Sequence, residues 1–164
     1  MSLLNPSSYA DVVDAVIADM RTNVFQEITE RNVRRYAQFP IEVMENDNEK
    51  HIGCWVSASG AEAARPLSMG VFGGSAMLDQ LYELVYWEPS PTEEQQEQRM
   101  DPDAAKRLLA LSEAVKARFF DSDTLHLGGA FSVAYQSLAA WGLGRGVRFI
   151  AWTFVATRPI SSTP

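Results

Sequence analysis

Hydrophobic and polar residues near the start of the chain follow the period of an amphipathic helix. Apolar side chains recur at spacings of three and four residues, which places them along one helix face: Tyr9, Val12, Val13, Val16, Ile17 and Met20. Ser8 precedes this stripe and Asp11 follows three residues later, an arrangement typical of a capping box. The sequence therefore predicts a helix that begins at Tyr9 and ends near Arg21.

After Pro40 the period changes to two, which favours strands. Residues 41–43 and 51–57 are joined by a polar stretch rich in Asn and Asp, so they predict a β-hairpin. Residues 58–76 are rich in Gly, Ala and Ser and predict a loop or a bent strand. Aromatic and β-branched side chains then alternate along residues 80–88, which predicts another strand.

An acidic segment, residues 88–103, separates this strand from a second helical pattern. It contains six acidic residues against Arg99 alone, and Pro89 and Pro91 lie near its start. Such a composition buries too little apolar surface to build a core. We therefore expect residues 88–103 to form an exposed acidic loop.

The second helix is predicted from Pro102, with Asp101 as its N-cap, to Phe120. Its buried stripe is expected to consist of Leu108, Leu111, Ser112, Val115 and Phe119. Strands are predicted for the remaining segments rich in aromatic and β-branched residues, which are 124–127, 130–141 and 146–157. The last of these is apolar on both faces, so we expect it to be covered on both sides or to meet a partner chain.

This order of elements predicts an α+β fold with two main helices packed on a mostly antiparallel β-sheet. A length of 164 residues and a hydrophobic content of 46% fit a single domain that spans residues 1–164. The first residues lack the pattern of a signal peptide, and glycines and arginines interrupt the least polar stretch. We therefore expect a soluble protein that is neither exported nor held in a membrane.

The charge distribution changes this picture in one respect. A net charge of −7 argues against broad binding to DNA phosphates. All 21 acidic residues lie at or before Asp123, whereas residues 124–164 carry three arginines and no acid. We expect this asymmetry to be visible on the folded surface.

Few residues of the sequence suggest a catalytic, metal-binding or ligand-binding role. The glycines at 142–146 resemble a phosphate-binding loop, but they lie between two predicted strands, which favours a hairpin connection. Cys54, the only cysteine, is expected to be a small buried hydrophobe, and neither His51 nor His126 has a metal-ligand partner at helical spacing. The arginines within residues 31–35 are interpreted as a solvated face rather than an anion site. We expect no catalytic residue, no metal and no cofactor.

Three segments together resemble a known family. They are the amphipathic helix that begins at Tyr9, the aromatic strand and polar loop of residues 81–91, and the helical residues 103–119, followed by closing strands. In the order of its elements and in their residue patterns, the chain is similar to the tail terminator proteins of long-tailed (siphophage-type) bacteriophages. That family has no catalytic signature, so the resemblance assigns no functional residue.

The resemblance implies a structural protein of the virion tail that is assembled in the host cytoplasm. It implies a ring, usually a homo-hexamer, that stops polymerisation of the tail tube protein and joins the tail to a neck or head-closure protein. DNA would pass through this ring without specific binding, and a negatively charged wall suits such a conduit. Two alternatives stay open: a head-closure, neck or other minor tail component, and more distantly a small α+β enzyme or ligand-binding domain.

A closed ring needs heterologous contacts, in which one face of a subunit meets a different face of the next. The acidic N-terminal part and the acid-free C-terminal part are candidates for these two faces. We expect arginines near the C-terminus to contact carboxylates of the adjacent subunit, Arg148 first among them, and strand aromatics to contribute. The candidate interface residues are Arg145, Arg148, Arg158, Trp152, Glu93, Glu94 and Glu97.

Overall fold

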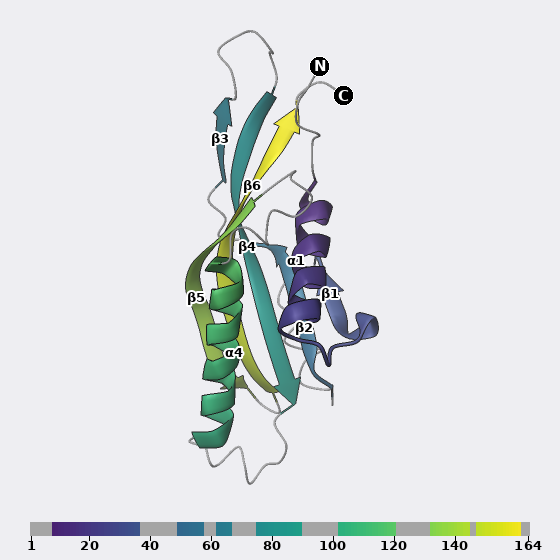
Figure 1. Ribbon diagram of the computed structural model, residues 1–164, viewed down its shortest axis with the longest axis vertical. Coiled ribbons are helices and arrows are strands. Elements are labelled where there is room, and N and C mark those ends of the chain that lie inside the picture. The colour runs from purple at the N-terminus through teal and green to yellow at the C-terminus, as the bar shows by residue number, and fades with distance from the viewer. Residues whose placement is uncertain are drawn as a thin grey trace.

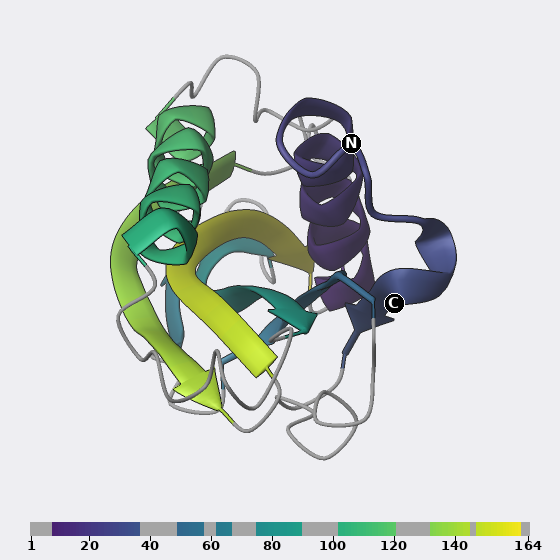
Figure 2. The ribbon, with the colours of Figure 1, turned by 90° about the horizontal axis from the view of Figure 1, so that it is seen from below.

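The computed structural model describes residues 8–36, 49–57, 62–66, 75–89, 102–120, 132–144 and 147–161. In this part of the chain two long helices pack on one face of a single twisted, curved sheet (Figures 1 and 2). The helices are α1 (Tyr9–Asn23) and α4 (Pro102–Phe120), and a short 3-10 helix, η1, spans Glu30–Asn32. The strands are β1 (Val33–Arg35), β2 (His51–Val56), β3 (Glu62–Pro66), β4 (Ser75–Pro89), β5 (Ser132–Gly144) and β6 (Val147–Ser161).

The strands form a six-stranded sheet in the order β1-β2-β4-β6-β5, and β3 pairs with the first part of β4 beside β2. Every pairing is antiparallel except that of β1 with β2. The predicted α+β class, with two helices on a mostly antiparallel sheet, is therefore confirmed. In Figure 2, α4 lies over the β5 side of the sheet, whereas α1 lies toward β1 and β2.

Both helices begin where the sequence predicts. The Ser8 backbone N–H donates to Asp11 Oδ2 at 2.7 Å, and the Asp11 backbone N–H donates to Ser8 Oγ at 3.3 Å, which completes the capping box of α1. The apolar stripe of α1 is buried as expected, and the helix continues two residues past Arg21 to Asn23. Helix α4 starts at Pro102 and buries Leu108, Ser112, Val115 and Phe119.

The core is built on the alignment of β4 with β6. Their pairing runs without a shift from Ser75↔Ser161 to Pro89↔Val147, so even-numbered residues of both strands share the face that the helices cover. Tyr82, Leu84, Tyr86, Ile150, Trp152, Phe154 and Ala156 lie on this face and belong to the main core cluster with the apolar stripes of α1 and α4. Phe25 adds a ring stacked on Tyr86 with centroids 5.0 Å apart.

A second, smaller cluster lies on the opposite face of the sheet. It contains Trp55, Val85, Trp87 and Ala151, with Phe149 packed against it. On this face of β6 Ala151 is buried, whereas Phe149, Thr153, Val155 and Thr157 are only partly buried, so the last strand is fully covered on the helix side alone. Gly53 lies among these rings: a Cβ atom at this position would be 2.5 Å from Cζ3 of Trp55 and 3.2 Å from Cζ3 of Trp87.

The structure corrects several predicted boundaries. Strand β4 begins at Ser75, inside the segment predicted as a loop or bent strand, and that segment also contains β3. The described partners of β2 are β1 and β4; residues 41–43 of the predicted hairpin lie outside the described part of the chain, as do residues 124–127. The glycine-containing connection at 142–146 joins the antiparallel strands β5 and β6, which confirms the hairpin interpretation over the phosphate loop.

The largest correction concerns the exposure of Glu88. The sequence places Glu88 both at the end of the predicted strand 80–88 and at the start of the acidic loop 88–103, and the loop prediction makes it exposed. In the structure Glu88 belongs to β4, is 2% exposed and lies opposite Arg148 in the sheet. Residues 90–101 of the predicted loop lie outside the described part.

We predict that Gly53→Ala destabilises the fold by about 1–3 kcal/mol, because the added methyl group forces two packed indole rings apart. Urea unfolding followed by circular dichroism measures this change. Trp55→Ala in the Gly53→Ala background removes the nearer ring, so the two substitutions should be strongly non-additive. Additive effects would contradict the packing argument.

Candidate functional site

The described interface candidates lie inside the protomer. Trp152 is fully buried and its indole Nε1 donates to Ser112 Oγ of α4 at 3.1 Å. Arg148 is 4% exposed and Arg158 is 6% exposed. These three side chains are buried within the protomer and leave little surface for a neighbouring subunit, so contact with another copy stays a prediction. Arg145, Glu93, Glu94, Glu97 and His126 lie outside the described residues.

Glu88 is buried and forms the centre of a polar cluster at one end of the core, in which the Arg107 side chain is 44% exposed. Arg107 of α4 binds both of its carboxylate oxygens, and Arg107 Nη1 lies 2.6 Å from Glu88 Oε2. The Tyr86 hydroxyl donates to the same oxygen at 2.8 Å, and burial followed by the nearby Glu88 charge raises the pKa of Tyr86. This cluster fixes the start of α4 against the end of β4.

Arg158 occupies the other end of the helix-covered face. Its guanidinium carbon lies 4.3 Å from the centroid of the Tyr9 ring, at the start of α1. Burial raises the pKa of the neighbouring Tyr82 to about 12, and Arg158 opposes part of this rise. A charged side chain thus lies at each end of the core, Glu88 at one and Arg158 at the other. Although Arg158 belongs to the acid-free third of the sequence, it is therefore not a surface charge.

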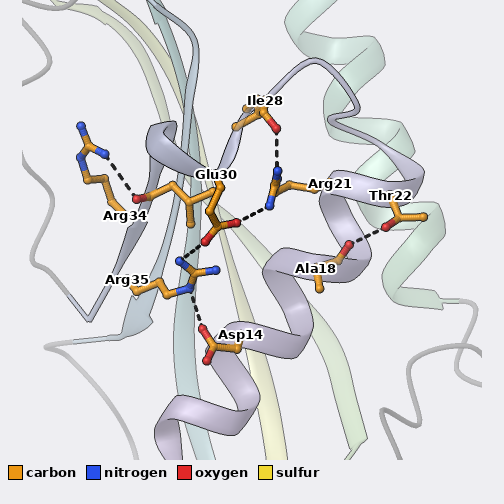
Figure 3. A network of polar contacts seen from close by, with 9 residues as sticks. Asp14, Ala18, Arg21, Thr22, Ile28, Glu30, Arg34 and Arg35 are labelled. Carbon is orange, nitrogen blue, oxygen red and sulfur yellow. Dashed lines mark hydrogen bonds and ion pairs between the residues drawn. The ribbon is translucent and has the colours of Figure 1, made fainter.

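Ion pairs also fix α1 to its neighbours. Figure 3 shows Arg35 of β1 between Asp14 of α1 and Glu30 of η1, with Nε 2.6 Å from Asp14 Oδ1 and Nη1 2.5 Å from Glu30 Oε1. Arg21 pairs with the same Glu30 and donates from Nε to the Ile28 carbonyl at 3.0 Å. The hydrogen bond from Arg35 is the largest influence that lowers the pKa of Glu30. Arg35 is therefore part of a partly buried ion-pair network, whereas Arg31, whose side chain is 72% exposed, is solvated as predicted.

A further ion pair connects the two helices directly. Arg118 near the end of α4 binds both carboxylate oxygens of Asp19 in α1, with Nε 2.8 Å from Oδ2. The Asp19 side chain is buried, so this bidentate pair lies at the contact between the helices. No local sequence signal predicts it, because the two residues are far apart in the chain.

Cys54 and His51, the described residues whose side chains could take part in a reaction, are both buried. Cys54 is fully buried and burial raises its pKa, so the thiol stays protonated and out of reach of a substrate. This confirms the expectation of a small buried hydrophobe. The His51 ring is buried, lies parallel to the Trp87 ring at 5.1 Å and has Nδ1 2.8 Å from the Glu49 carbonyl.

Four large apolar side chains of the described residues stay exposed: Tyr9, Tyr36, Leu109 and Phe120. Sequence reasoning did not select them. Leu109 and Phe120 do not belong to the buried stripe of α4, so the helical period could have identified them as outward-facing apolar residues. Tyr36 could not be found in this way, because it follows a strand of only three residues.

The described residues hold no group of three or more His, Cys, Asp or Glu side chains placed to bind a metal ion. None of the described helices has the length and apolar composition needed to cross a membrane. No protein-family model matches the chain, and a comparison with curated proteins finds none that is similar to it.

We predict that Glu88→Ala lowers the free energy of unfolding by about 3 kcal/mol, because it removes the acceptor of Tyr86 and Arg107 and leaves Arg148 beside an empty position. Glu113→Ala is the matched control, since Glu113 is an exposed acid of α4 that pairs only with Lys116. Its effect should stay within about 0.5 kcal/mol. Equal effects in urea unfolding would show that the cluster does not stabilise the fold.

Proposed function

We propose that this chain is a structural protein of a bacteriophage tail, a tail terminator that forms a ring and caps the tail tube. The observation that carries the proposal is the order of the elements. A capped amphipathic helix, an aromatic strand, a second helix and a closing hairpin are the features on which the resemblance rests. Figure 1 shows them in one layer of helices on one sheet.

The use of charged and reactive groups also supports a structural role. Arg107, Arg118 and Arg35 are held by carboxylates of the same chain. Cys54 and His51, the described residues most suited to catalysis, are buried. Charge in this protein therefore stabilises architecture, and we propose that the chain is not an enzyme.

The partners follow from the same proposal. The ring, of about six subunits, would contact the tail tube protein on one side and a neck or head-closure protein on the other. DNA would pass through it without specific binding, which a net charge of −7 favours. The ring would be part of the virion tail after assembly in the host cytoplasm.

We predict that the purified protein sediments with the mass of about six subunits and forms hollow rings in negative-stain images. Mixed with assembled tail tubes, a terminator should bind the one end at which polymerisation stops. Rings that leave tube ends bare would favour a head-closure or other neck role instead. A chain that remains monomeric at all concentrations, with and without tubes, would overturn the proposal.

The charge variant that the sequence suggests, Arg148→Glu, is unsuitable as a test of assembly. It would place a second carboxylate opposite Glu88 in the core, so the protomer itself would unfold. Variants of exposed residues are needed to separate folding from assembly.

A further inference from the structure

We draw no further inference here: the strongest candidate, the set of exposed apolar side chains formed by Leu109 and Phe120 on α4 and by Tyr36 beside β1, where the backbone has φ 57, carries none because nothing in the structure shows what covers these side chains.

Discussion

The fold depends on the antiparallel pairing of β4 with β6. Both strands have 15 residues, and their register has no shift along the whole length. Because side chains alternate between faces, this register decides for both strands which residues meet the helices and which form the cluster around Trp55 and Trp87. A slip of one residue would turn one strand over relative to the other and bring either Glu83 of β4 or Thr153 of β6 under the helices. The bulges of the sheet occur instead in the pairing of β5 with β6, at the edge of the sheet.

Ion pairs between different elements add to the apolar core in determining how the helices lie on the sheet. Glu88 with Arg107 holds the start of α4, Asp19 with Arg118 holds its end, and Arg35 with Asp14 holds the other side of α1. Each pair joins two different elements, so each constrains where a helix lies on the sheet. Isolated surface pairs contribute little to stability, but a buried carboxylate such as Glu88 is costly to leave without its partners. The charges thus fix the arrangement of the helices on the sheet.

Features of the fold that depend on the local spacing of apolar and polar residues could be predicted from the sequence. The capping box at Ser8, the stripes of both helices and the strand character of residues 80–88 follow from neighbours in the chain, and the structure contains all of them. The burial of Glu88 could not be predicted, because the acids and prolines that follow it indicate an exposed loop, whereas its burial depends on Arg107 and on the register with β6. A count of arginines likewise does not reveal that Arg148 and Arg158 are buried within the protomer. Tyr36 emerged only from the backbone conformation and exposure.

The position of β6 also has a consequence for the order in which the chain is made. It is the last strand in the sequence, yet it lies between β4 and β5 in the sheet. When the chain has been made up to Gly144, β4 and β5 therefore both lack the strand that lies between them in the sheet. The core can close only after β6 has been made, and the pairing of β6 with β4 joins segments far apart in the sequence, which is slow. Early termination of translation would leave the aromatic face of β4 open to aggregation.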